Sequence, residues 1–169
     1  LHRELSRSLR EELDLGGEAA NALRFARESA GDPGVVVPRV HPERSAGRVL
    51  CLERIDGERL PDWLAACDGR GERGLAERDR LLGILVRTTS AQILERGFLH
   101  ADPHPGNFLV VEKAHGPELA ILDFGAVLEI PVARRHAWAS LVLDGAARDV
   151  PRTIALLEAL GFSAGGDRT

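Results

Sequence analysis

Hydrophobic positions recur at helical spacing in several parts of the chain. Residues 1–29 carry leucines four positions apart, from Leu5 to Leu13, with charged residues on the other faces. This spacing predicts an amphipathic helix. Gly16 and Gly17 interrupt the pattern, so we expect a break or a kink there. The same periodicity predicts four further helices, over residues 60–67, 75–96, 132–147 and 150–160.

Shorter apolar runs between these helices predict strands. Residues 35–40 and 48–55 are apolar runs joined by a polar loop, which indicates two strands. Residues 108–112 and 119–124 flank the turn sequence "KAHGP", which is typical of a β-hairpin. Strands near the front of the chain and helices after them predict an α+β fold.

Composition and charge exclude several classes of protein. The chain has 169 residues, of which 44% are hydrophobic and 28% charged, as in a soluble globular domain. The net charge of -4 argues against a nucleic-acid binder. There is no apolar run of membrane-spanning length and no signal peptide pattern. Cys51 and Cys67 form no CxxC pair, so a reducing compartment is expected.

The candidate catalytic and metal-binding residues lie in and after the stretch "GFLHADPHPGNFLV", residues 97–110. Its first residue, Gly97, is a typical stop for the preceding helix. Asp102 and Asn107 lie five positions apart, and Asp123 follows in "LDFG" after the predicted hairpin. Protein kinases use this spacing. Phosphoryl transfer needs a carboxylate to orient and deprotonate the acceptor, and hard oxygen ligands for Mg²⁺. We therefore predict that Asp102 is catalytic and that Asn107 and Asp123 bind Mg²⁺, although each residue alone could simply cap a turn or end a strand.

The two histidines of this stretch allow a second interpretation. His100, His104 and Asp102 could be zinc ligands, but Pro103 and Pro105 prevent the helix that would align them. We therefore expect His100 to be a buried, hydrogen-bonded anchor for the loop. His104 is expected to position the loop or a phosphate.

Two motifs together resemble those of the UbiB/AarF-type atypical kinases. They are "HADPHPGNFLV…LAILDFG" and, far upstream, "EELDLGGEAANALRF" at residues 11–25. The family is protein-kinase-like and is associated with ubiquinone biosynthesis and other isoprenoid-lipid metabolism. The resemblance covers about residues 11–162 and implies a protein-kinase-like fold. It would place a partial N-lobe (helix αC plus two strands) in residues 1–56, a mainly helical C-lobe with the catalytic hairpin in 57–162, and a tail in 163–169.

The resemblance also implies roles for acidic residues of the first helix. Glu18 would be the αC glutamate that pairs with an ATP-binding lysine. Glu12 and Asp14 would be the acidic pair that faces the active site and tunes its activity. Without the resemblance, charges on a helix are more often a solvated face.

ATP and Mg²⁺ are the implied cofactors. Besides Glu18 and His104, the resemblance places a hinge at residues 52–57, which would bind adenine through backbone groups. The hinge residues assigned to cofactor binding are Glu53, Arg54 and Ile55.

The nucleotide-binding lysine of the family has no counterpart in the expected place. Its glycine- or alanine-rich loop and strand lysine would precede the first helix, and the K-x-G-Q and A-P-E motifs are also absent. Lys113, the only lysine, lies in the predicted hairpin turn and cannot replace it. We therefore expect the chain to be a truncated piece of a longer protein or a degenerate member. Alone, it should bind Mg-ATP weakly.

Three functional hypotheses remain open. The first is the catalytic part of a UbiB-type kinase or ATPase. The second is an aminoglycoside- or choline-kinase-like phosphotransferase, which shares H-x-D-x-H-x-x-N, although Pro103 and the upstream helix favour the first. The third is a non-catalytic, pseudokinase-like binding module. Expected partners are ATP and a small-molecule, lipid or protein acceptor, with no nucleic acid. A cytoplasmic location is expected, peripheral to or anchored at the inner membrane through parts outside this chain.

Overall fold

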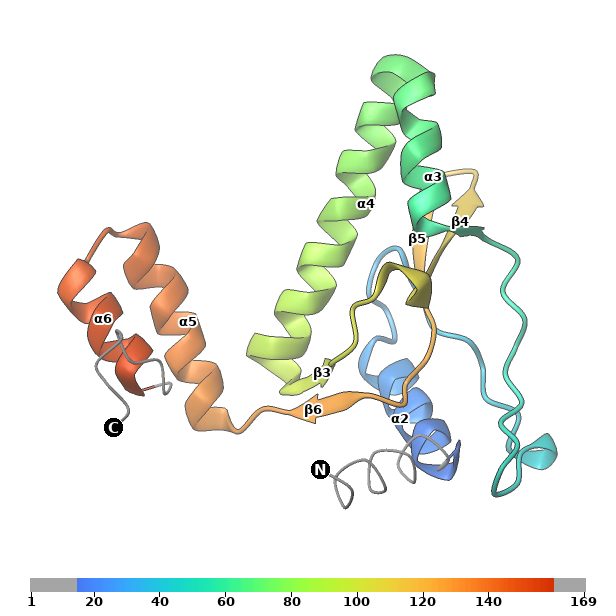
Figure 1. Ribbon diagram of the computed structural model, residues 1–169, viewed down its shortest axis with the longest axis horizontal. Helices are drawn as coiled ribbons and strands as arrows, with labels where there is room; N and C mark the ends of the chain where they lie inside the picture. The colour runs from blue at the N-terminus through green and yellow to red at the C-terminus, as the bar shows by residue number, and fades with distance from the viewer. Residues whose placement is uncertain (1–14, 160–169) are drawn as a thin grey trace, which may run out of the picture. The chain divides into compact units, whose positions relative to one another are not determined.

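The computed structural model describes residues 15–159, so the acidic pair predicted at Glu12 and Asp14 lies outside the described residues (Figure 1). The first described helix is α2, Leu15–Glu28. Gly16 and Gly17 are helical, so the predicted break at these residues is wrong. Glycine costs about 1 kcal/mol in a helix. The buried apolar face of α2 offsets this cost, because helices in proteins are stabilised mainly by packing.

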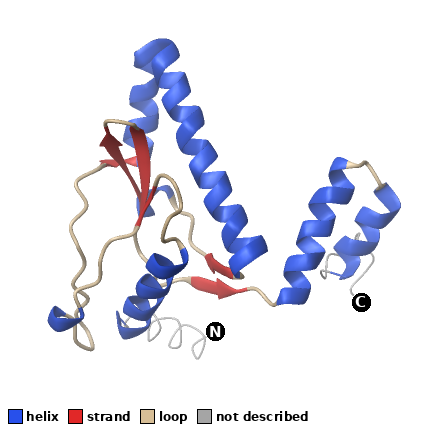
Figure 2. Cartoon of the chain, turned by 180° about the vertical axis from the view of Figure 1, so that it is seen from behind, coloured by secondary structure: helices blue, strands red, loops and turns tan. Residues whose placement is uncertain are grey.

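The larger of the two sheets has four strands, in the order β1-β5-β4-β2. Figure 2 draws the strands in red. β4 and β5 form the predicted antiparallel hairpin, with Phe108 opposite Ile121. β1 is parallel to β5, and β2 is antiparallel to β4. The strands are β1, Val35–Val36; β2, Glu58–Arg59; β4, Phe108–Lys113; and β5, Gly116–Ile121.

The predicted strands at 35–40 and 48–55 are wrong in extent. Only β1 is a named strand there. The two segments meet through one isolated bridge, Val40–Leu52, and a second bridge, Ala46–Val49, lies within the loop and the start of the second segment. Pro38 interrupts the first segment, and a proline has no N–H to donate to a neighbouring strand. A 3₁₀ turn, Pro42–Arg44, follows between them. β2 instead pairs with β4 from a segment whose sequence shows no strand pattern.

Three helical segments follow β2. The predicted short helix is confirmed as α3, Leu60–Cys67, and a 3₁₀ turn, Asp68–Arg70, links it to α4, Gly71–Ala91. The long helix therefore begins earlier than predicted and continues into a π-helical turn, Gln92–Arg96. Gly97 ends it as predicted, with a φ of 67° and an N–H that donates to the Gln92 carbonyl at 2.8 Å.

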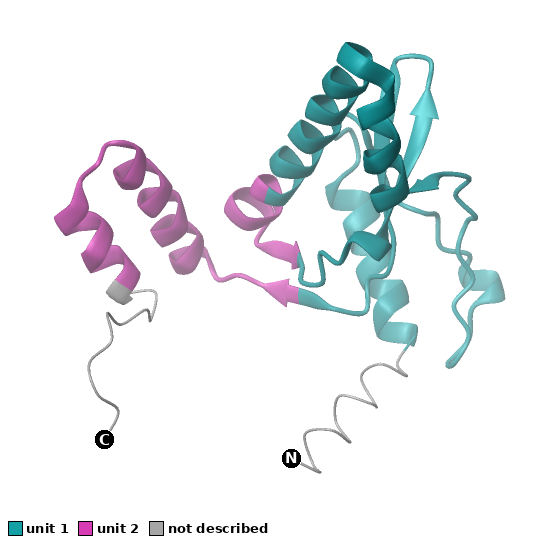
Figure 3. Ribbon diagram, turned by 45° about the horizontal axis from the view of Figure 1, so that its top comes forward, with its two compact units in different colours: residues 1–89, 100–127 teal, residues 90–99, 128–169 magenta. Residues whose placement is uncertain are grey.

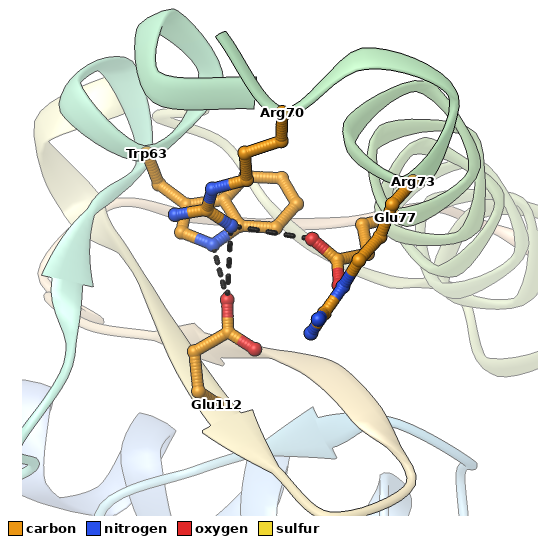
Figure 4. Close-up of polar contacts among 5 residues, drawn as sticks. All are labelled: Trp63, Arg70, Arg73, Glu77 and Glu112. Atoms are coloured by element: carbon orange, nitrogen blue, oxygen red, sulfur yellow. Dashed lines mark hydrogen bonds and ion pairs between the residues drawn. The ribbon is translucent and has the colours of Figure 1, made fainter. Parts of the chain in front are cut away.

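A polar network fixes α3 and α4 to strand β4 (Figure 4). The Trp63 indole is fully buried and donates from Nε1 to Oε1 of Glu112 at 2.6 Å. The Arg70 guanidinium lies 5.6 Å from the Trp63 ring centroid and 3.5 Å from the Glu112 carboxylate. Glu77 accepts from Arg73 at 2.7 Å and from Arg70 at 3.2 Å. The network therefore holds β4 on the helices.

The chain divides into two compact units, residues 1–89 with 100–127 and residues 90–99 with 128–169 (Figure 3). The second contains α5, Val132–Ala146, and α6, Val150–Ala159, which confirm the two predicted helices. A second, two-stranded sheet was not predicted; it pairs β3, Phe98–His100, with β6, Val127–Glu129. The division into lobes near residue 56 stays a prediction.

Over residues 15–159, none of the helices is both long and apolar enough to span a bilayer.

Candidate active site

A short, tightly bonded loop joins β3 to β4. His104 caps its 3₁₀ turn, Pro105–Asn107, because His104 Nδ1 accepts the Gly106 N–H at 3.1 Å. Pro105 suits the first position of such a turn, where no N–H is needed. The described contact of His104 is therefore with its own loop, which fits a role in positioning that loop.

Asp102 and Asn107 are joined directly within this loop. Asn107 Nδ2 donates to Asp102 Oδ2 at 3.0 Å and to the Asp102 carbonyl at 3.1 Å. The Asn107 carbonyl also accepts the Leu122 N–H at 2.8 Å, which ties the loop to the end of β5. The two bonds to Asp102 use the side-chain nitrogen Nδ2 of Asn107. The side-chain oxygen Oδ1 is therefore the atom that could bind a cation.

Asp123 lies just beyond β5 in an unusual backbone conformation. Its φ is 58°, in the left-handed region that few residues other than glycine adopt. Its Oδ1 accepts the Gly125 N–H at 3.0 Å, a local turn that aspartate forms readily. The chain thus turns sharply at Asp123 as it leaves the sheet.

His100 holds the backbone at this turn. The side chain is buried, and Nε2 donates to the Asp123 carbonyl at 2.7 Å, with the Leu122 carbonyl at 3.2 Å. Its ring lies 5.9 Å from that of Phe124 and 6.1 Å from that of Phe25. The expected role of His100 as a buried anchor is therefore confirmed.

Helix α2, which lies more than 100 positions earlier in the sequence, contacts the turn through hydrogen bonds to Phe124. Glu18 Oε1 accepts the Phe124 N–H at 3.4 Å, and Asn21 Nδ2 donates to the Phe124 carbonyl at 2.9 Å. The Phe25 ring lies 5.1 Å from that of Phe124, which is fully buried. Burial raises the pKa of Glu18; the Phe124 N–H opposes this shift, and the Asp123 charge adds to it.

These contacts bring together most, but not all, of the predicted site residues. Asn107 bonds to Asp102 and, through its carbonyl, to Leu122, which precedes Asp123. Glu18 bonds to Phe124, the residue after Asp123. The hinge residues have other contacts: Glu53 Oε2 accepts the Arg39 N–H at 3.1 Å, and Arg54 pairs with Asp56 at 3.1 Å. The roles of Glu53, Arg54 and Ile55 in binding adenine therefore stay predictions.

Sequence reasoning assigned no role to Asn21 or Phe25. Both could have been found from their positions on α2, three and seven residues after Glu18. Residues at these intervals share one face of a helix. That face is the one that meets Phe124.

An aspartate and an asparagine in one loop, followed by a hairpin and a D-F-G turn held by a preceding helix, define a kinase-like protein. The family model of the ABC1 atypical kinase-like domain matches residues 1–157, so the chain belongs to this family. The resemblance to UbiB/AarF-type kinases is thereby confirmed.

Named relatives agree with this membership. The chain is 36% identical over 139 residues to the chloroplastic protein ACTIVITY OF BC1 COMPLEX KINASE 3 of Arabidopsis thaliana, covering 82% of this chain and 18% of the relative. It is 38% identical over 127 residues to a probable protein kinase UbiB of Vibrio vulnificus, covering 74% of this chain and 22% of the relative. The chain thus spans about a fifth of the length of these relatives.

A solved structure supports the fold directly. The structure of Rv3197 in complex with erythromycin, from Mycobacterium tuberculosis, matches with a TM-score of 0.67 and 26% identity. The match covers 99% of this chain and 40% of that one. The predicted α+β, kinase-like fold is confirmed.

Proposed function

We propose that the chain forms the ATP-binding and catalytic part of an atypical kinase or ATPase. The observation that carries the proposal is the joining of Asp102 to Asn107 in one loop, beside the Asp123 turn that His100 holds. Relatives named as protein kinases support the reaction class. By the same resemblance we infer a link to ubiquinone or other isoprenoid-lipid metabolism.

Asp102 is the proposed base. Its side chain is exposed, so an acceptor hydroxyl could reach it, and the bond from Asn107 fixes the orientation of its carboxylate. Such a carboxylate orients the acceptor and takes its proton during transfer. The acceptor is a small molecule, a lipid or a protein group, and membrane association would come from other parts of the full-length protein.

The Asn107 and Asp123 side chains fit Mg²⁺. An amide oxygen and a carboxylate are the hard oxygen ligands that this ion takes in proteins. When bound, Mg²⁺ neutralises charge on the phosphates. Glu18 would pair with a nucleotide-binding lysine, His104 would keep the loop in shape, and the backbone of residues 52–57 would bind adenine.

ATP turnover by an Asp102→Asn variant tests the proposal. Using the protein in its full length, we expect phosphate release to fall about 100-fold or more, because a positioned base contributes on the order of 10²–10⁴-fold. ATP binding and the circular dichroism spectrum should be unchanged. Asp79→Asn is the matched control, since Asp79 is exposed on α4. Full turnover in Asp102→Asn would refute the role of Asp102, and nucleotide binding without turnover in the unmodified protein would favour a pseudokinase.

A further inference from the structure

Three hydrogen bonds link the two peptide groups that follow Asp123 to other parts of the chain. His100 Nε2 donates to the Asp123 carbonyl at 2.7 Å, and the N–H of the same peptide group donates to Glu18 at 3.4 Å. The next carbonyl, that of Phe124, accepts from Asn21 Nδ2 at 2.9 Å. Asn21 therefore makes the shorter of the two hydrogen bonds between α2 and this turn.

The turn needs such support because of its conformation. Asp123 has a φ of 58°, and left-handed backbone persists in residues other than glycine only where the surroundings hold it. The Gly125 N–H bond to Asp123 Oδ1 fixes the side chain locally, but it does not link the turn to the rest of the protein. The whole Phe124 residue is buried, with 0% of its surface exposed, so its carbonyl needs a protein donor, which Asn21 supplies.

We propose that Asn21 is a positioning residue, which sets the orientation of the Asp123 carboxylate for the metal by holding the Phe124 carbonyl on helix α2. The inference rests on the proposed function, because it takes Asp123 as a metal ligand. Without the Asn21 donor, the Phe124–Gly125 peptide group keeps the local Gly125 N–H bond to Asp123 Oδ1 but loses its bond to α2, so the left-handed turn can relax. The metal then loses affinity although both of its proposed protein ligands are still present.

The experiment compares metal and nucleotide binding in the full-length protein. Isothermal titration calorimetry would measure the Kd of Mg²⁺ in the presence of a non-hydrolysable ATP analogue, and the Kd of the analogue without metal. For Asn21→Ala we expect the Mg²⁺ Kd to rise about 10- to 100-fold, the usual effect of losing a group that orients a ligand. The metal-free Kd of the analogue should not change. Hydrogen exchange at the Phe124 and Gly125 amides should become faster.

Two further variants complete the design. Asn21→Leu keeps the approximate size of the side chain and removes the amide donor without adding a charge, so it should weaken Mg²⁺ binding as Asn21→Ala does, and it replaces that variant if the latter fails to fold. Leu23→Ala, at an exposed position of the same helix, should leave the Mg²⁺ Kd unchanged.

The outcomes separate this inference from the function on which it rests. If Asp123→Asn abolishes Mg²⁺ binding and both Asn21 variants keep the original Kd, the role of Asn21 is refuted and the proposed function stands. If Asp123→Asn leaves Mg²⁺ binding intact, the metal assignment fails and this inference fails with it. An equal rise in the metal-free Kd of the analogue would also overturn the inference, because it would show general damage to the fold.

Discussion

Replacing Gly97 by alanine should destabilise the protein strongly, because the backbone there suits only glycine. Gly97 has a φ of 67°, and an added Cβ would lie 2.7 Å from the Ile130 carbonyl oxygen and 2.9 Å from Arg135 Nε. Two backbone hydrogen bonds prevent residue 97 from shifting to relieve this overlap. Its N–H donates to the Gln92 carbonyl and its own carbonyl accepts from the Ile130 N–H, both at 2.8 Å.

The expected loss of stability follows from the left-handed backbone at Gly97 and from the overlap of an added Cβ with the Ile130 carbonyl. A left-handed conformation costs an L-residue about 1–2 kcal/mol. Relieving the overlap with the Ile130 carbonyl would weaken a backbone hydrogen bond worth about 1 kcal/mol. We therefore expect Gly97→Ala to lower the free energy of unfolding by about 2–3 kcal/mol.

Gly83 provides a matched control within the preceding helix. It lies inside α4, and the nearest atom to an added Cβ is Nη1 of the flexible Arg87 side chain, at 3.2 Å. Gly83→Ala should raise the free energy of unfolding by about 0.5–1 kcal/mol, because alanine is the better helix former. Urea unfolding followed by circular dichroism measures both variants. A Gly97→Ala protein as stable as Gly83→Ala would refute the left-handed turn at Gly97.

Two further predictions concern the network of α3, α4 and β4. Trp63→Phe removes the donor to Glu112 and leaves unfilled space in a buried site, so it should cost about 1–3 kcal/mol in urea unfolding; a change below about 0.5 kcal/mol, typical of a surface substitution, would contradict the described contact. Hydrogen bonding from Arg73, with a further bond from Arg70, lowers the pKa of Glu77 below its ordinary value of 4.5. The stability that this provides is present above about pH 4.5 and is lost as the pH falls through the lower folded pKa. Thermal unfolding should therefore show Glu77→Gln less stable than the original protein at pH 7, with a difference that shrinks in acid; a difference independent of pH would contradict this.

Local sequence patterns predicted the parts of the structure that depend on local chemistry. The hairpin of β4 and β5 and the helix stop at Gly97 follow from short apolar runs, turn residues and glycine geometry. The burial of His100 could be expected because it lies between apolar residues and next to the loop that it anchors.

Long-range pairing could not be predicted in this way. β2 consists of two exposed residues, Glu58 and Arg59, and is a strand only because it meets β4, far away in the sequence. The bond from Asn21 to Phe124 spans 103 positions. The helical period showed which α2 residues share a face, but it held no information about what that face would contact.

The most direct test of the central claim is phosphate release from ATP by an Asp123→Asn variant of the full-length protein, measured as the Mg²⁺ concentration is raised. The claim is that Asp102, Asn107 and Asp123 form one phosphoryl-transfer site. It predicts turnover that depends on Mg²⁺ in the original protein and that is lost in the variant at every Mg²⁺ concentration, with an unchanged circular dichroism spectrum. Turnover in Asp123→Asn with the original dependence on Mg²⁺ would contradict the claim.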